Sequence, residues 1–530
     1  MKQLYFGGPI LTMEDVPDPE AVLVVDGRIE QTGRLSEFSG EAEVQRIDLK
    51  GRALLPAFLD PHSHLTAVAQ TLGLADLSGV VSFEEIKSRM CAYMEQANPQ
   101  PGEWVIGFGY DPNSLQEKQH PTKLLLDEIS SNPVVITHAS GHMGVMNTAA
   151  LEALNITEET PDPEGGRIGR MAGSREPDGF LEETAFTGQS GRIPRPTLAQ
   201  QLRQLSRAEE VYFRHGITTI QDGLTRSAEW ELLHAAAEQN LLRADVVCYV
   251  DLEQSADLLT ENPEYCAQYH HHLKIDGYKI FLDGSPQGRT AWMSTPYCGE
   301  PEGYCGYPVH PTVQIKEFVK KALLEKMPLL AHCNGDAAAE QLISCMEEAM
   351  LETGREPVRP VMIHAQLVRR NQLARMAKLG MFASFFTAHS WHWGDVHLQN
   401  FGLKRAEHIS PAHSAKEFGV PFTFHQDSPV IPPDMIETVW CAVNRRTKNG
   451  VSLDGGEKID VLDALKAVTL HAAEQYGEQD EKGSIREGKR ADFVILSEDP
   501  RRVPPDQLKR IRVLETIREG QTLFSEKQPE

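Results

Sequence analysis

The sequence of 530 residues lacks any apolar run of about 18 residues, the length that a helix needs to cross a bilayer. Positive charge is scarce: 52 Lys and Arg stand against 76 Asp and Glu, and the formal net charge of −24 argues against nucleic acid or a membrane surface as a partner. The eight cysteines form no CxxC pair and no regular spacing, which is typical of a reduced, cytoplasmic protein. The first residues lack an apolar stretch ahead of a cleavage site, so we expect no signal peptide.

Two histidines, His62 and His64, follow the apolar run 53–59. Side chains two residues apart on a strand point to the same face, so these imidazoles converge on one point, as the first two ligands of a divalent metal do. A hydrogen-bonded pair at the end of a strand would explain the same spacing. The pair alone therefore does not establish a metal site.

Further apolar runs deliver ligand-type side chains in the same way. Three of them end in His332, His364 and Asp427, and a fourth, 275–282, carries Lys279 in its middle. Helix-like stretches lie between these runs, at 311–325, 337–353 and 368–379. Alternating strands and helices predict a parallel α/β fold, and ligands at several strand ends predict a (β/α)8 TIM-type barrel with its active site at the C-terminal mouth.

The ordered series of 59–64, Lys279, His332, His364 and Asp427 resembles the metal-centre pattern of the amidohydrolase superfamily. Within it, the sequence is most similar to the branch of N-substituted formamide deformylases and exoenzyme regulatory proteins. The segment 332–336 resembles the family's H-x-x-G-D motif, and 483–492 resembles its closing signature. The similarity runs from about residue 23 to residue 514.

Two positions beside ligands depart from the family pattern. Ile363 stands where the E-H-A-Q motif has Glu, and Gln426 stands where the S-D-x-P motif has Ser. Groups behind the ligands tune metal affinity by roughly ten- to a hundredfold. These departures therefore leave two alternatives for the metal site, a centre of weakened affinity or one that holds a single metal.

The resemblance implies a metal-binding set and a mechanism. The set comprises His62, His64, Lys279, His332, His364 and Asp427, with Glu183 as an alternative acid close to the metal. Imidazoles and a carboxylate suit one or two divalent ions, zinc above all, and an open position on such an ion lowers the pKa of water toward roughly 7. Asp427 is then the general base. Relatives carboxylate the counterpart of Lys279 into a bridging ligand, whereas an ordinary Lys279 would pair with a carboxylate such as Asp283.

The residues that would contact the substrate are less sharply indicated. His142 ends another strand and would polarise a carbonyl group or hold a loop. The ring cluster at 389–393 suits an apolar substrate group or loop packing, and it contributes His389, Trp391, His392 and Trp393. Arg289 and Arg445 would clamp a substrate carboxylate or lie on the surface.

The pattern of elements divides the chain into three segments. Residues 1–51 and 484–530 have short strands and turns, and family members join such ends into one small β-sandwich. The barrel would span 52–483 and carry a large insertion at about 65–207, with a helix at 83–97.

The expected function is hydrolysis of a non-peptide carbon–nitrogen bond, in an amide, formamide or cyclic amide, by a metal-activated water. The binding partner would be a small amide-type molecule. A homodimer is one possible oligomeric state. Two alternatives remain: decarboxylation or isomerisation on the same scaffold, and a non-catalytic regulator that senses a ligand. Retention of the whole set argues against the regulator, because a sensor has no need for the base; the set is His62, His64, His332, His364 and Asp427.

Overall fold

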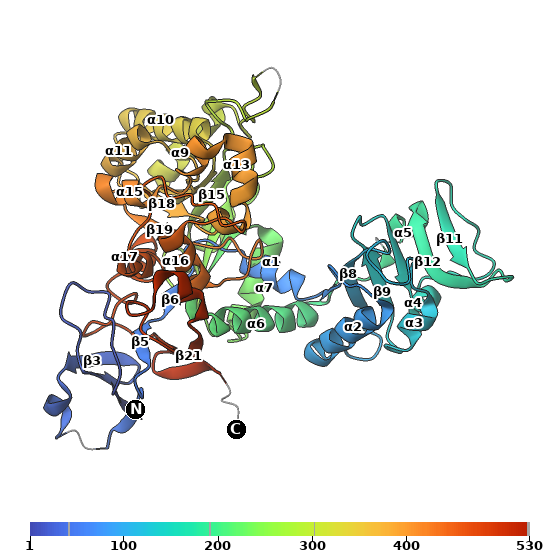
Figure 1. The fold of residues 1–530 in the computed structure, drawn as a ribbon, viewed down its shortest axis with the longest axis horizontal. Coiled ribbons are helices and arrows are strands. Elements are labelled where there is room, and N and C mark those ends of the chain that lie inside the picture. Colours follow the sequence, from blue (N-terminus) through green and yellow to red (C-terminus); the bar gives the residue numbers. More distant parts are fainter. Residues whose placement is uncertain (41–42, 190–191, 301–302, 527–530) are drawn as a thin grey trace. The chain divides into compact units, whose positions relative to one another are not determined.

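A computed structural model describes residues 1–40, 43–189, 192–300 and 303–526 (Figure 1). The chain forms two compact units, the first made of Met1–Ala67 with Ala208–Glu530 and the second of Val68–Arg207. Each unit has sheets and apolar clusters of its own. No helix among the described residues is long and apolar enough to span a membrane.

An eight-stranded parallel sheet forms the centre of the first unit. Its order is β6 (Phe58–Leu59), β13 (Ile217–Thr225), β14 (Asp245–Asp251), β15 (Leu273–Phe281), β16 (Leu329–Cys333), β17 (Val361–His364), β18 (Phe382–Phe385) and β19 (Phe422–Phe424). Every neighbouring pair is parallel. Just beyond the outer strands, the amide of His64 donates to the carbonyl of Ser428 at 2.9 Å. The predicted α/β class is confirmed as a curled parallel sheet.

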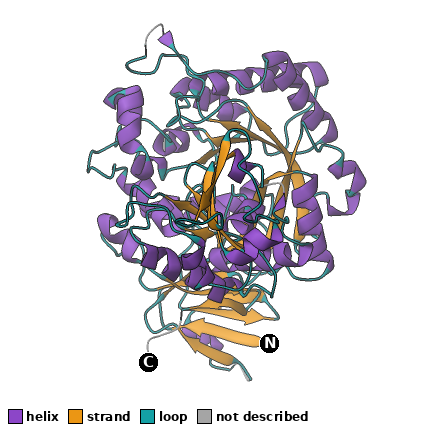
Figure 2. Ribbon diagram, turned by 90° about the vertical axis from the view of Figure 1, so that its right-hand side faces the viewer, coloured by secondary structure: helices purple, strands orange, loops and turns teal. Residues whose placement is uncertain are grey.

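Helices alternate with these strands and surround the sheet (Figure 2). They are α7 (Ser227–Glu238), α8 (Leu258–Glu261), α9 (Thr312–Glu325), α10 (Asp336–Thr353), α11 (Arg370–Lys378), α12 (His389–His392), α13 (Gly394–Phe401), α14 (Leu403–Ala406), α15 (Ala412–Phe418), α16 (Met435–Asn444), α17 (Val461–Ala467) and α18 (Leu470–Gln475), with the part of α6 (Leu198–Arg214) that follows Arg207. Strands covered by helices are buried on both faces, and β14 accordingly has every residue buried. The helices predicted from the pattern match α9, α10 and α11 to within two residues at each end.

The apolar run 53–59 is not the single strand expected from the sequence. Its first part, β5 (Ala53–Pro56), pairs antiparallel with β20 (Phe493–Leu496) in another sheet, and only β6 joins the parallel sheet. The break follows Pro56, which has no N–H to donate to a ladder. The chain changes partner there, because the amide of Ala57 bonds to Asp492 and that of Phe58 to Gly216.

The two ends of the chain form two four-stranded sheets. One has the order β3 (Arg28–Gly33), β2 (Ala21–Val25), β1 (Lys2–Phe6), β4 (Gln45–Asp48), and the other β22 (Gln521–Ser525), β21 (Val513–Arg518), β20, β5. They share an apolar cluster, in which the ring of Tyr5 lies 5.3 Å from that of Phe493. This shared core supports a composite β-sandwich, whose boundaries at residues 51 and 484 stay predictions.

The second unit is built on a six-stranded mixed sheet. Its order is β11 (Gly166–Arg170), β12 (Pro177–Glu183), β10 (Met143–Met146), β9 (Val134–His138), β8 (Val105–Tyr110) and β7 (Ala75–Asp76). The helices are α2 (Phe83–Ala97), α3 (Lys123–Asp127), α4 (Thr148–Ala153) and α5 (Thr184–Thr187). Helix α2 has the bounds expected from its periodicity, and Ser82 caps it by accepting from the amide of Glu85 at 3.2 Å.

Candidate metal centre

Three predicted ligands from different strands converge in the first unit. One ligand atom from each of His62, His364 and Asp427 lies within 4.8 Å of the other two. His62 follows β6, His364 ends β17, and Asp427 follows β19, so the C-terminal ends of three parallel strands deliver the set. Oδ1 of Asp427 lies 3.3 Å from Nε2 of His62.

The other predicted ligands of this unit contact the same group. Nε2 of His64 lies 3.2 Å from Oδ1 of Asp427. Nδ1 of His332 lies 3.0 Å from Nε2 of His364, and Nζ of Lys279 lies 3.4 Å from Nε2 of His62. All six predicted ligands of the first unit thus form one continuous cluster.

The backbone is strained where two of these ligands leave their strands. His364 has φ 72° and Asp427 has φ 57°, in the left-handed region that non-glycine residues seldom adopt. Such conformations cost about 1–3 kcal/mol each and gather at functional sites. Here they place an imidazole and a carboxylate on the same cluster.

Burial sets the charge state of the cluster. It lowers the pKa of His332 to about 4 and that of His62 and His364 well below the usual range, which leaves neutral imidazoles, the metal-binding form. Burial acts to raise the pKa of Asp427, but the close imidazole of His64 and then those of His62 and His364 outweigh it, so the carboxylate is ionised. Burial also lowers the pKa of Lys279 to about 7.

The donor set fits a divalent cation. Oδ1 of Asp427 is buried, and among the described residues it has no hydrogen-bond partner. An anionic oxygen without a donor is costly unless a cation faces it. Neutral imidazoles beside a carboxylate are the donors that zinc and similar metals prefer.

Sequence reasoning missed two side chains that hold the ligands. Nε2 of His425 lies 3.1 Å from Nδ1 of His364, and Nδ1 of His425 lies 2.9 Å from the Ser384 hydroxyl. Oε1 of Gln221 lies 2.7 Å from Nδ1 of His62. Such contacts fix the tautomer and orientation of a ligating ring.

A signal for His425 was present in the sequence. His425 stands two residues before Asp427, the same spacing that singled out His62 and His64. Gln221 lies in the middle of the mostly polar segment that becomes β13, and nothing in that segment singles it out.

Part of the predicted ring cluster approaches the metal centre through Phe386. The Phe386 ring lies 5.3 Å from that of His425, 4.6 Å from that of His389 and 5.9 Å from that of Trp393. Trp391 instead packs on Trp440, with Nζ of Lys509 4.1 Å above its ring, and His392 pairs with Glu437 at 2.7 Å.

The two predicted arginines have other partners. Arg289 pairs with Glu300 and donates through Nε to Asn400 at 2.8 Å. Arg445 is 1% exposed and donates to the main-chain carbonyl groups of Glu407, Ile409, Ser410 and Leu453 at 2.6–3.2 Å. Its guanidinium is committed to the main chain, which speaks against the predicted carboxylate clamp.

His142 and Glu183 belong to the second unit. Nδ1 of His142 lies 3.2 Å from Oε2 of Glu183, and both side chains are more than half exposed. The pair joins the start of β10 to the end of β12. Their roles toward substrate and metal stay predictions.

A curled parallel sheet that brings histidines and an aspartate together at its strand ends defines a metal-dependent hydrolase of the α/β class. The chain belongs to the amidohydrolase family, whose model (Amidohydro_3) matches residues 45–524. It is 29% identical to the Bacillus subtilis (strain 168) protein YtcJ over 99% of both chains. It is 27% identical to an N-substituted formamide deformylase of Arthrobacter pascens over 94% of both chains.

A solved structure of an uncharacterised metal-dependent hydrolase from Pyrococcus furiosus matches with a TM-score of 0.73 and 25% identity, over 95% of this chain and 100% of that one. These likenesses confirm the superfamily and the branch that the sequence motifs indicated.

Proposed function

We propose that the protein hydrolyses a non-peptide carbon–nitrogen bond of a small amide, formamide or cyclic amide. The observation that carries this proposal is the cluster of six ligand-type side chains around the unpartnered Oδ1 of Asp427. The likeness to a formamide deformylase over nearly the whole chain favours this bond class.

The residues of the cluster have separate tasks. His62, His64, His332, His364 and Lys279 would hold one or two divalent ions, zinc first, together with Asp427. A bound divalent ion supplies a water of lowered pKa and polarises the carbonyl group under attack. Asp427 is ionised, so it would accept a proton from the attacking water and pass it to the leaving nitrogen.

Lys279 would act as a carboxylated bridging ligand. Its amine is buried and its pKa is lowered to about 7, so a neutral amine that can react with carbon dioxide is available near neutral pH. The rings of Phe386, His389 and Trp393 would receive an apolar group of the substrate.

The proposal also covers the closure of the barrel, the location of the protein in the cell and its oligomeric state. The parallel sheet would close as a complete (β/α)8 barrel, which the hydrogen bond between His64 and Ser428 supports. A cytoplasmic location is supported by the free state of all eight cysteines. A homodimer stays an expectation from the resemblance.

The test is amine release from a panel of N-substituted formamides, simple amides, cyclic amides and dipeptides, with wild-type protein and Asp427→Asn. Turnover of a non-peptide amide by the wild type, lost in the variant, supports the proposal. Turnover of dipeptides alone, decarboxylation without amine release, or tight ligand binding without turnover would each contradict it.

A further inference from the structure

The first unit contains a cavity, separate from the metal cluster, at the same end of the parallel sheet. It has a volume of about 390 Å³. The segments that line it follow β15, β16, β17 and β18, and include Met293, Asp336, Leu367, Arg369 and Arg405. None of the predicted metal ligands lines it. The volume is within the range of small-molecule sites.

Positive charge dominates the walls of this cavity. The Arg and Lys side chains that line it are Arg369, Arg370, Lys404 and Arg405, against two carboxylates, Asp336 and Glu457, with His408 beside them. The chain as a whole carries a formal charge of −24, so a concave surface with excess cations is a local departure from its composition.

Both carboxylates are already satisfied by other groups. Asp336 accepts from the amide and the hydroxyl of Ser294, and Glu457 accepts from the amide of Ser414 at 2.9 Å and from its hydroxyl at 2.6 Å. They remain anionic, so the lining has four cations against two carboxylates, an excess of two positive charges.

Among the described residues, Lys404 and Arg405 have no carboxylate partner, and of the two only Arg405 has its side-chain nitrogens engaged by main-chain carbonyl groups. Arg405 donates to the carbonyl groups of Thr295, Pro296 and Phe401 at 2.8–3.1 Å, which position the guanidinium without neutralising it. Within the described ranges, no ion pair joins Lys404 or Arg405 to a carboxylate, whereas Arg370 pairs with Glu417 at 2.9 Å. Arg369 pairs with Glu340 at 3.4 Å and lies 3.6 Å from Asp336.

The floor of the cavity is apolar. Met293, Leu367, Val368 and Pro411 are buried there, and Met293 and Leu367 belong to an apolar cluster beneath it. A ligand that fits these walls carries an anionic group at one end and an apolar body at the other.

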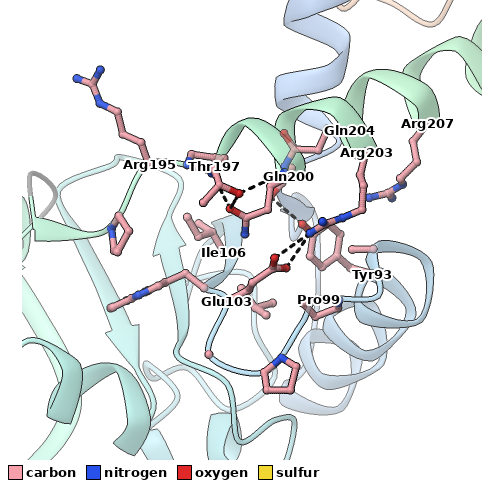
Figure 3. Close-up of a pocket in the computed structure, with 18 residues that line it drawn as sticks. Tyr93, Pro99, Glu103, Ile106, Arg195, Thr197, Gln200, Arg203, Gln204 and Arg207 are labelled. Atoms are coloured by element: carbon pink, nitrogen blue, oxygen red, sulfur yellow. Dashed lines mark hydrogen bonds and ion pairs between the residues drawn. The ribbon is translucent and has the colours of Figure 1, made fainter. Parts of the chain in front are cut away.

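The pocket of the second unit is also lined by more cations than carboxylates, with Arg195, Arg203 and Arg207 beside Glu103 (Figure 3). It has a volume of about 370 Å³ and also contains arginines. There Nη2 of Arg203 lies 2.8 and 3.0 Å from the carboxylate oxygens of Glu103, and Arg207 donates to the Leu72 carbonyl at 3.2 Å. Excess positive charge is thus shared by both pockets, and what distinguishes the cavity of the first unit is its place at the strand ends that carry the metal cluster.

We propose that the cavity between the loops after β15–β18 is a binding site for a small organic anion, a carboxylate or phosphate on an apolar body, anchored by Lys404, with the positive charge of Arg369 and Arg405 beside it. This site goes beyond the hydrolysis proposed above, because its lining contains no metal ligand. Binding there needs no turnover, so it can be tested whether or not the protein hydrolyses amides.

The test is calorimetric titration of the full-length protein with benzoate and with benzyl alcohol, its neutral counterpart of similar size. We expect one benzoate per chain and at least tenfold weaker binding of benzyl alcohol. The variant Lys404→Gln should weaken benzoate binding about tenfold, and Arg369→Gln with Lys404→Gln more. Lys378→Gln removes another exposed lysine, on α11, and should leave binding unchanged.

A carboxylate can also bind a metal, so Asp427→Asn is titrated in parallel. Benzoate binding that persists in Asp427→Asn and falls in Lys404→Gln assigns the anion to this cavity. Binding that is lost in Asp427→Asn and unchanged in Lys404→Gln would place it at the metal cluster and overturn the proposal. The absence of benzoate binding at tens of millimolar would also overturn it.

Discussion

Nζ of Lys279 lies 3.4 Å from Nε2 of His62, with both side chains buried. A protonated amine beside a metal ligand would repel a divalent cation, whereas a neutral amine can be carboxylated and then attract one. Burial lowers the pKa of Lys279 to about 7, so a substantial share of the amine is neutral near pH 7. This contact therefore connects the charge of one lysine to the number of metals that the centre holds.

Replacing this lysine tests the connection. Lys279→Met should reduce the metal content by about one ion per chain and abolish any stimulation of activity by bicarbonate. Lys274→Met is the matched control, because Lys274 is buried on the same strand but pairs with Glu478 and Asp276. Equal metal contents in wild type and Lys279→Met would show that Lys279 is not a bridging ligand.

Asp427→Asn keeps the size of the side chain and removes its basicity. We expect turnover to fall by about a hundredfold or more, because the amide cannot accept the proton from water. Metal content is measured on the same sample, since the amide oxygen can still act as a weak ligand. Near-normal turnover in a metal-loaded variant would rule out Asp427 as the base.

His425 should set metal affinity through His364. His425→Phe removes the hydrogen bonds to His364 and Ser384, and we expect metal affinity to fall by roughly ten- to a hundredfold. His471→Phe is the control, because it makes the same replacement on α18, where the ring bonds to the Phe422 carbonyl. Chelator competition measures both. Identical affinities in the two variants would leave His425 a packing residue only.

Asp245 on β14 should govern acid stability. It pairs with Lys482 at 2.5 Å, Arg518 at 2.7 Å and Arg490 at 2.9 Å. Burial acts to raise the pKa of Asp245, but these cations, Lys482 foremost, outweigh it and hold the pKa well below its usual range. The pKa of Asp245 is lower in the folded protein than in the unfolded chain, so its ionised carboxylate stabilises the fold at any pH above the unfolded pKa of about 3.9. This stabilisation is lost as the pH falls through the pKa of the folded state.

Asp245→Asn should therefore lower the free energy of unfolding by about 3 kcal/mol. The deficit relative to wild type should stay constant from pH 8 to about pH 4 and shrink only at lower pH. Urea unfolding across this range measures it, with the exposed Asp480→Asn as control. A deficit that disappears by pH 6 would contradict the assignment.

Arg445→Met distinguishes a structural arginine from a substrate clamp. Four main-chain carbonyl groups lose their donor, so we expect unfolding to become easier by about 3 kcal/mol. The ratio of KM values for carboxylated and uncharged substrates should stay the same. Arg446→Met alters the exposed neighbour and serves as control. A selective rise in KM for carboxylated substrates would restore the clamp.

The sequence predicted that the six ligand-type side chains converge because they stand at or near strand ends, where a parallel sheet brings distant segments together, and their role as metal ligands stays a prediction. The strand at 53–59 was misjudged because nothing local shows that the chain changes sheets after Pro56. Arg445 could not be judged either, since its carbonyl partners come from segments that only the fold brings near. His425 was overlooked although its spacing to Asp427 repeats that of His62 and His64.

The most direct test of the account is the number of metals per chain, measured by elemental mass spectrometry on protein purified without added metal or chelator. We expect one or two divalent ions, zinc first, and fewer in a variant that combines His62→Asn with His64→Asn. Two ions would support the binuclear centre with carboxylated Lys279, and one would support a mononuclear hydrolase. A wild-type protein that binds no metal even after zinc or manganese is added would contradict the account.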